Sequence, residues 1–128
     1  MLEKDGRITF SELARRLGVS EAAVRKRVKR LEREGVIKGY CARVDPKKLG
    51  FEIHAVIGMD VRPDKLMAVI RSLKEMKPKS LYLCAGDHTV LFEAWFRNSG
   101  ELERFVEAAE SLEGVSRVCP SVLLEKII

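Results

Sequence analysis

The sequence predicts an α+β protein in which an N-terminal helix-turn-helix is followed by a ferredoxin-like domain with the element order βαββαβ. Two amphipathic helical segments separated by a short glycine-containing turn occupy the first third of the chain, and strand and helix patterns alternate over the remainder. The charge divides in the same way. Residues 1–48 hold 14 Lys and Arg against 7 Asp and Glu, whereas residues 49–128 hold 10 against 12. The two parts are therefore expected to have different roles.

The first predicted helix begins at a capping box. In Thr9-Phe10-Ser11-Glu12, the Thr9 hydroxyl and the Glu12 carboxylate can satisfy backbone N–H groups reciprocally. We expect a helix over residues 10–17, with its apolar side chains on one face. Gly18 follows at a point where a left-handed conformation would end the helix and turn the chain.

The second predicted helix is strongly basic. Ser20 can cap it and Gly35 ends it, so we expect a helix over residues 21–34. Six of the nine residues from Arg25 to Arg33 are Lys or Arg, and most of them point away from the apolar stripe of Val24, Val28 and Leu31. Two helices joined by such a turn match the helix-turn-helix, whose second helix enters the DNA major groove.

The basic face of this helix predicts a polyanionic partner. Double-stranded DNA fits best, because a helix fits the major groove and its cations displace condensed counterions. We expect base contacts from the entrance and first turns of the helix, at Ser20, Ala22, Arg25, Lys26 and Lys29. We expect phosphate contacts from Arg15, Arg16, Arg30, Arg33 and Lys38. The alternative is that these charges form only a solvated helix face and bind no partner.

The second part of the chain alternates strands and helices. The segment Ile53–Val61 places apolar residues at every second position, which predicts a strand. A helix follows Pro63-Asp64, and a second helix is capped by Asn98-Ser99. The remaining expected strands are Leu81–Ala85, Val90–Phe96 and a last strand from Val115 to about Leu124. In this split βαβ order, both helices cover one face of the sheet.

The opposite face of the predicted sheet is apolar rather than polar. It carries Val56, Tyr82, Cys84, Leu91 and Trp95 at alternate strand positions. An apolar face of this kind needs a cover, and the same face of a second copy is the simplest one. The pattern therefore predicts a homodimer, which also supplies the two recognition helices that a palindromic DNA site requires.

Other features of the sequence argue against several classes of protein. No apolar run approaches the roughly 20 residues of a membrane-spanning helix, and the N-terminus does not resemble a signal peptide, so we expect a cytoplasmic protein. Cys41, Cys84 and Cys119 are odd in number and widely spaced, which favours neither a disulfide framework nor a metal site. His54 and His88 lie in no catalytic motif. Neither enzymatic activity nor a cofactor is expected.

Four segments, ELARRLGVS (residues 12–20), AVRKRVKRLE (23–32), GVIKGY (35–40) and DPKKLG (45–50), together resemble the Lrp/AsnC, or feast/famine, family of prokaryotic transcription regulators. The triplet Gly86-Asp87-His88 is similar to the Gly-Asp-aromatic hairpin of that family. The resemblance implies a winged helix-turn-helix domain over residues 1–39, a linking strand over 40–50 that helps the dimer form, and a ferredoxin-like regulatory and dimerisation domain over 51–128.

The resemblance also implies a sequence-specific DNA-binding transcription regulator, modulated by a small molecule such as an amino acid. Family members form dimers and further octamers, with effector pockets near the hairpin, so Gly86, Asp87 and His88 become the candidate effector-binding residues. The structural alternative is that Gly86 and Asp87 only make a tight turn.

The sequence departs from the family pattern at two points. Family members usually have a helix before the capping-box helix, and here it would already be ending at Met1, so we expect the helix-turn-helix to lack its first helix. Thr89 stands where many members have an acidic residue. Two alternative functions follow: a stand-alone amino-acid sensor or subunit with weakened DNA binding, and nonspecific DNA compaction.

Overall fold

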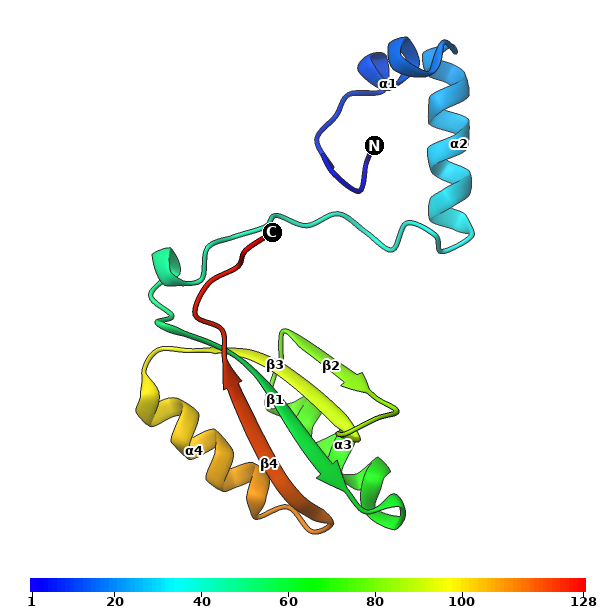
Figure 1. The fold of residues 1–128 in the computed structure, drawn as a ribbon. Coiled ribbons are helices and arrows are strands. Elements are labelled where there is room, and N and C mark those ends of the chain that lie inside the picture. Colours follow the sequence, from blue (N-terminus) through cyan, green and yellow to red (C-terminus); the bar gives the residue numbers. More distant parts are fainter. The chain divides into compact units, whose positions relative to one another are not determined.

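The computed structural model describes residues 1–128, which form two compact units, Met1–Val44 and Asp45–Ile128 (Figure 1). The boundary between them lies inside the segment predicted as a linker. Unit 1 contains the helices α1 (Phe10–Leu17) and α2 (Glu21–Arg33). Unit 2 contains β1 (Ile53–Val61), α3 (Leu66–Glu75), β2 (Ser80–Leu83), β3 (Val90–Phe96), α4 (Ser99–Glu110) and β4 (Val115–Val122). No helix is long and apolar enough to cross a membrane.

The helices of unit 1 begin at the residues that the sequence indicates, and α2 ends at Arg33, one residue earlier than expected. The Thr9 hydroxyl accepts a hydrogen bond from the Glu12 N–H at 3.1 Å, and the Ser20 hydroxyl accepts one from the Ala23 N–H at 3.1 Å. Gly18, with φ of 65°, provides the left-handed turn after α1. A small core of Leu13, Ala14, Val24 and Val28 holds the two helices together.

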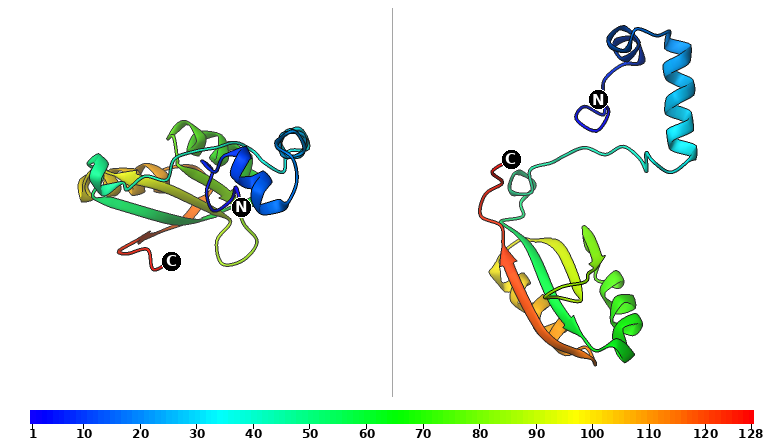
Figure 2. Two further views of the ribbon diagram at one scale, coloured as in Figure 1. Left: turned by 90° about the horizontal axis from the view of Figure 1, so that it is seen from above. Right: turned by 45° about the vertical axis from the view of Figure 1, so that its right-hand side comes forward.

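Unit 2 is a four-stranded antiparallel sheet with the strand order β2-β3-β1-β4, seen side by side in Figure 2. The central strand β1 pairs with β3 on one side and with β4 on the other. Ala55, Ile57 and Met59 are fully buried on one face of β1. Residues of α3 and α4 join the same core, including Val69, Leu73 and Ala109, so both helices cover this face as the βαββαβ pattern predicts.

The other face of the sheet carries the apolar residues that the alternation places there. Val56, Leu91 and Trp95 are half-buried, and Tyr82 is 55% exposed. This face also holds a hydrogen bond between strands, in which His54 Nε2 lies 2.7 Å from Glu93 Oε1. The face is thus apolar with isolated polar pairs.

The linking strand predicted over residues 40–50 is not a strand in the single chain. Residues 39–45 belong to no ladder, and Lys47–Leu49 forms a short 3₁₀-helix that ends at Gly50. A strand requires hydrogen bonds to a neighbouring strand, and within one chain this segment has no such neighbour. Its extended residues end at the Pro46 turn, where the Asp45 carboxylate accepts a hydrogen bond from the Lys47 N–H at 3.0 Å.

The most deeply packed aromatic residue of unit 2 gives a test of its core. Phe92 is 1% exposed, and its ring centroid lies 4.5 Å from that of Phe105 on α4. We expect Phe92→Ala to lower the free energy of unfolding by about 3–5 kcal/mol, because it removes buried apolar surface and leaves a cavity. Denaturant unfolding measures the change. Leu124→Ala, at a side chain 85% exposed, is the control, and equal effects of the two variants would contradict this core.

Candidate functional site

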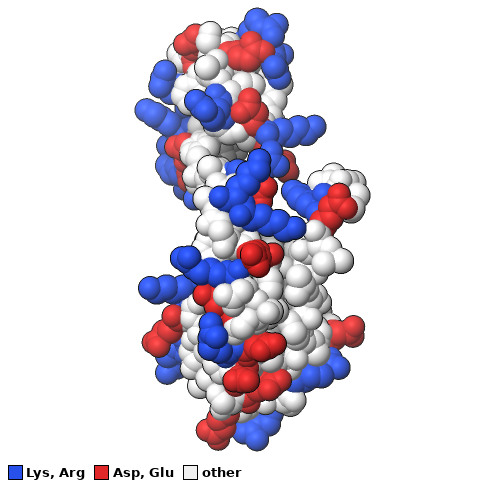
Figure 3. Space-filling model, turned by 90° about the vertical axis from the view of Figure 1, so that its left-hand side faces the viewer, with Lys and Arg blue, Asp and Glu red and all other residues white.

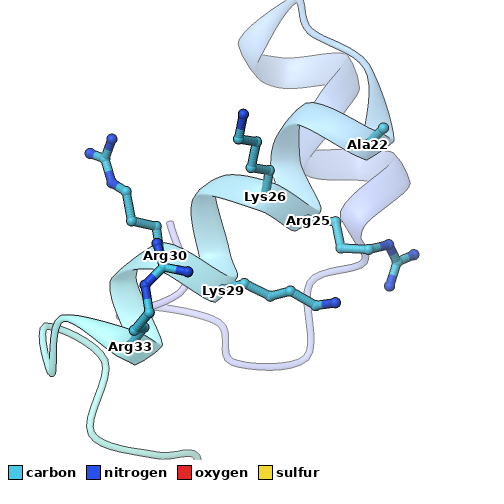
Figure 4. A pocket seen from close by; sticks show the side chains of 6 residues that line it. All are labelled: Ala22, Arg25, Lys26, Lys29, Arg30 and Arg33. Carbon is cyan, nitrogen blue, oxygen red and sulfur yellow. The ribbon is translucent and has the colours of Figure 1, made fainter.

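Unit 1 has a net positive charge, with 12 Lys and Arg against 6 Asp and Glu, and Lys and Arg side chains project from much of its surface in Figure 3. On α2 the basic side chains share one outward face. The residues that line a shallow groove along this face are Ala22, Arg25, Lys26, Lys29, Arg30 and Arg33. Arg25 and Lys29 project to one side of the helix axis, and Lys26 and Arg30 project to another (Figure 4).

The orientation of this face is fixed by the packing of the opposite face. Val24 and Val28 of α2 are 2% and 5% exposed, and they pack against Leu13 and Ala14 of α1. Rotating α2 about its axis would pull these side chains from the core and bury charge instead. The basic groove is therefore held outward by the core of unit 1.

Few contacts within the chain compensate the positive charge of α2. Arg30 Nε lies 3.6 Å from Glu34 Oε1 in an exposed pair, and the Arg25 guanidinium lies 5.1 Å from the ring centroid of Phe10. Lys26, Lys29 and Arg33 have no carboxylate within 4 Å. Like charges on adjacent turns of a helix repel each other. An anionic partner with closely spaced charges would relieve this repulsion.

The two uncharged residues of the predicted base-contacting set have different positions. Ala22 is exposed at the start of α2 and leaves room for a partner to approach the helix. Ser20 is the N-cap, and its hydroxyl oxygen already accepts the Ala23 N–H. The Ser20 O–H remains available as a donor, so its role in the structure is first to cap α2 and only then to contact a ligand.

Two of the predicted phosphate-contacting residues share a carboxylate on α1. Arg15 Nη2 lies 2.6 Å and Arg16 Nε lies 2.5 Å from Glu12 Oε1. The hydrogen bonds from Arg15 and Arg16 lower the pKa of Glu12 to about 2. The Arg15 side chain is 72% exposed and that of Arg16 is 51% exposed, so both guanidiniums remain accessible. Lys38 is exposed next to Ile37, which packs against the core of unit 1.

The structure separates the three predicted effector-contacting residues. Gly86, with φ of 144°, and Asp87 are exposed in the turn between β2 and β3. His88 instead folds back onto the sheet, where its ring covers Gly58 so closely that a Cβ at that position would lie 2.4 Å from the ring. Gly58 is therefore required for this position of His88.

His88 belongs to an ionic network that sequence analysis did not predict. Its Nδ1 lies 3.0 Å from Asp60 Oδ1, and Arg117 Nε donates to Asp60 Oδ2 at 2.7 Å. The hydrogen bond with His88 and the charge of Arg117 lower the pKa of Asp60. The signal in the sequence is a single carboxylate, Asp60, in a mostly apolar strand. Its partner Arg117 becomes visible only through the pairing of β1 with β4, which a register shift interrupts directly after Asp60.

Thr89 serves the sheet rather than a ligand. Its hydroxyl accepts the Val61 N–H at 3.3 Å, and its own N–H donates to the Met59 carbonyl at 3.0 Å. The Thr89 carbonyl accepts the Cys84 N–H at 2.8 Å. These bonds close the hairpin onto β1 and position the turn at Gly86 and Asp87.

Residues 1–38 match a family model described as winged helix-turn-helix DNA-binding. The chain is 44% identical to the HTH-type transcriptional regulator LrpA of Pyrococcus horikoshii over 129 residues, which cover 99% of this chain and 92% of that protein. A feast or famine regulatory protein from M. tuberculosis, solved with L-methionine, is 31% identical with a TM-score of 0.83, covering 99% of this chain and 87% of that one. The AsnC structure from E. coli has the same fold, with 21% identity, a TM-score of 0.85 and coverage of 99% and 87%.

The pair of arginines on Glu12 gives a pH-dependent stability. The pKa of Glu12 falls from 4.5 to about 2 on folding, so its contribution is complete above pH 4.5 and is lost as the pH falls to about 2. We expect the difference in unfolding free energy between the native chain and Glu12→Gln to close across this window. Denaturant unfolding at a series of pH values measures it. Glu3→Gln is the control, and a difference that stays constant down to pH 2 would contradict the assignment.

Proposed function

Because the chain belongs to the Lrp/AsnC family of HTH-type transcriptional regulators, we propose that it recognises a specific DNA sequence through α2 and that a small molecule modulates this binding. The observation that supports the DNA-reading role best is the outward face of α2, whose basic side chains are mostly without ionic partners. The family is one of transcription regulators and not of enzymes.

We assign base contacts to the N-terminal half of α2 and phosphate contacts to its surroundings. Arg25, Lys26 and Lys29 can donate to base acceptors in the major groove, where an Arg pairs bidentately with guanine. Ala22 offers an apolar contact at the same surface, and Ser20 a hydroxyl donor at the entrance of the helix. Arg15, Arg16, Arg30, Arg33 and Lys38 surround this set and are proposed to hold phosphates.

We further propose that two copies pack through the apolar sheet face of unit 2. Val56, Leu91 and Trp95 are half-buried and Tyr82 is exposed, so a second copy would complete their burial. A two-fold axis through this contact would present two α2 helices to related half-sites. The extended residues 40–45 could then pair with the equivalent residues of the second copy, which would make the predicted linking strand real in the dimer.

An amino acid is the proposed modulator. A homologous regulator, 31% identical, has been solved with L-methionine. In this chain, the exposed turn at Gly86 and Asp87 offers backbone N–H groups for a carboxylate and a side-chain carboxylate for an ammonium group. The ionic network of His88, Asp60 and Arg117 lies at the base of the same turn. Binding there can shift populations between arrangements of the copies that differ in the spacing of their α2 helices.

Base reading by α2 is tested by comparing two kinds of variant on two DNAs. Arg25→Ala and Lys26→Ala should weaken binding to the preferred sequence by about 1–3 kcal/mol and lose most of the preference over a shuffled sequence. Arg33→Ala should weaken both DNAs alike and lower the slope of log K against log salt by about 1. Fluorescence anisotropy over a salt series measures these changes.

Each alternative function predicts a different outcome of that comparison. If Arg25→Ala and Arg33→Ala behave identically on both DNAs, contacts are to phosphates alone, as in nonspecific compaction. If the native chain binds neither DNA while it still binds an amino acid, it is a stand-alone sensor. Leu124→Ala, which changes an exposed apolar side chain of the C-terminal segment, is the control for unaltered DNA binding.

The effector role of the turn is tested with Asp87→Asn. We expect L-methionine, or another member of a pool of the natural amino acids, to bind the native chain in calorimetry and to bind the variant at least about tenfold more weakly, because a charge-assisted hydrogen bond to the ammonium group is lost. Glu125→Gln is the matched control for the loss of one exposed carboxylate. Equal affinity of the native and Asp87→Asn chains would assign the turn a purely structural role.

A further inference from the structure

The Glu12 carboxylate is used differently in the structure from the way the sequence indicates. The Thr9 hydroxyl accepts the Glu12 N–H, which is one half of the predicted capping box. The other half, a bond from the Thr9 N–H to the Glu12 carboxylate, does not form, because the carboxylate is turned toward the guanidiniums of Arg15 and Arg16. Capping of α1 therefore does not account for the position of the Glu12 side chain.

Both oxygens of this carboxylate are occupied by arginine donors. Arg15 donates from Nε to Glu12 Oε2 at 3.0 Å and from Nη2 to Glu12 Oε1 at 2.6 Å, which makes a bidentate pair. Arg16 donates from Nε to Glu12 Oε1 at 2.5 Å. The spacing i, i+3, i+4 brings the three side chains together on the outer side of α1, opposite the buried Leu13 and Ala14. One carboxylate thus orients two guanidiniums.

The ion pairs leave part of each guanidinium free. A guanidinium has five N–H donors. Arg15 uses two of them on Glu12 and Arg16 uses one, and both side chains are exposed. The remaining donors can therefore reach an acceptor outside the chain while Glu12 keeps its own hydrogen bonds.

The same carboxylate reduces the charge of this face from two positive charges to one. The pKa of Glu12 is about 2, so the carboxylate is ionised at neutral pH. Binding of DNA without sequence preference is supplied by the attraction between protein cations and phosphates. Glu12 therefore weakens the general attraction of this face for DNA and at the same time fixes the orientation of its two arginines.

We propose that Glu12 is a positioning residue for DNA, which orients Arg15 and Arg16 toward the phosphates flanking the preferred sequence and weakens binding to other sequences. The inference rests on the proposed phosphate contacts of these two arginines. When α2 is seated in the major groove, the phosphates lie at fixed positions beside α1, and guanidiniums that are already oriented lose little freedom on contact. On DNA that is bound loosely, the phosphates do not occupy those positions, so only the reduced charge acts.

The uncharged isostere Glu12→Gln separates orientation from charge. It restores one positive charge to the face and removes the bidentate acceptor, and Gln at this position still suits a capping box. We expect the variant to bind a shuffled DNA about threefold more tightly and the preferred DNA about threefold more weakly, so that the preference falls about tenfold. Fluorescence anisotropy at about 0.1 M NaCl measures both affinities.

A thermodynamic cycle with the two arginines identifies the route of the effect. Arg15→Ala with Arg16→Ala should lower the slope of log K against log salt by about 2, since about 0.9 is lost for each phosphate contact. In that background Glu12→Gln should leave the preference unchanged, because no guanidinium remains to be oriented.

Glu3→Gln is the matched control for the loss of one negative charge in unit 1. Glu3 is exposed and has no Lys, Arg or His nitrogen within 4 Å. Its replacement should change the affinity for both DNAs by the same factor.

Changes in opposite directions on the two DNAs are expected only from a positioning role. If Glu12→Gln tightens both DNAs by the same factor, Glu12 acts through its charge alone, and if it weakens both alike, it only stabilises α1; either result would overturn the inference. A native chain with no preferred sequence, or an unchanged salt slope in Arg15→Ala with Arg16→Ala, would overturn the proposed DNA contacts and the inference together. A lowered slope with an unchanged preference in Glu12→Gln would overturn the inference alone.

Discussion

The packing of Val24 and Val28 against Leu13 and Ala14 is the interaction on which the DNA-binding surface depends. These four buried side chains decide which face of α2 is turned inward, and the basic residues follow onto the outer face by helical geometry. Because this core is small, the hydrogen bonds at the ends of the helices also contribute to the stability of unit 1. Thr9 and Ser20 cap the two helices, and Gly18 sets the turn between them. The outer face of α2 has few ion pairs within the chain, so an anionic partner would balance its positive charge best.

In unit 2, the central strand β1 likewise determines which side chains face the core and which face outward. Ala55, Ile57 and Met59 of β1 lie in the core beneath both helices, whereas His54, Val56, Gly58 and Asp60 occupy the other face. One face thus stabilises the single chain, and the other is the face that we propose for contacts between copies. The helices add a third kind of surface, in which charge is separated between α3 and α4. The unit therefore has surfaces of different chemistry, an apolar sheet face and two helices of opposite charge.

Helix and strand positions could be predicted from the sequence because their signals are local. The predicted capping residues Thr9, Ser20 and Asn98 cap helices in the structure. The alternation of apolar residues correctly predicted the first and last residues of β1. The network of Asp60, His88 and Arg117 could not be predicted, because it depends on the register of β1 with β4 and on the folding of His88 over Gly58. The linking strand over residues 40–50 stays a prediction, since it forms no strand within the single chain and a strand needs a partner that one copy does not supply.

The central claim is that α2 reads a sequence and that two copies do so together. Footprinting on the preferred DNA, after selection from a random library, tests it most directly. The account predicts two protected major-groove segments related by a dyad and separated by about one helical turn, 10–10.5 base pairs, or a multiple of it. Protection without a preferred position, or a selected library with no common sequence, would contradict it.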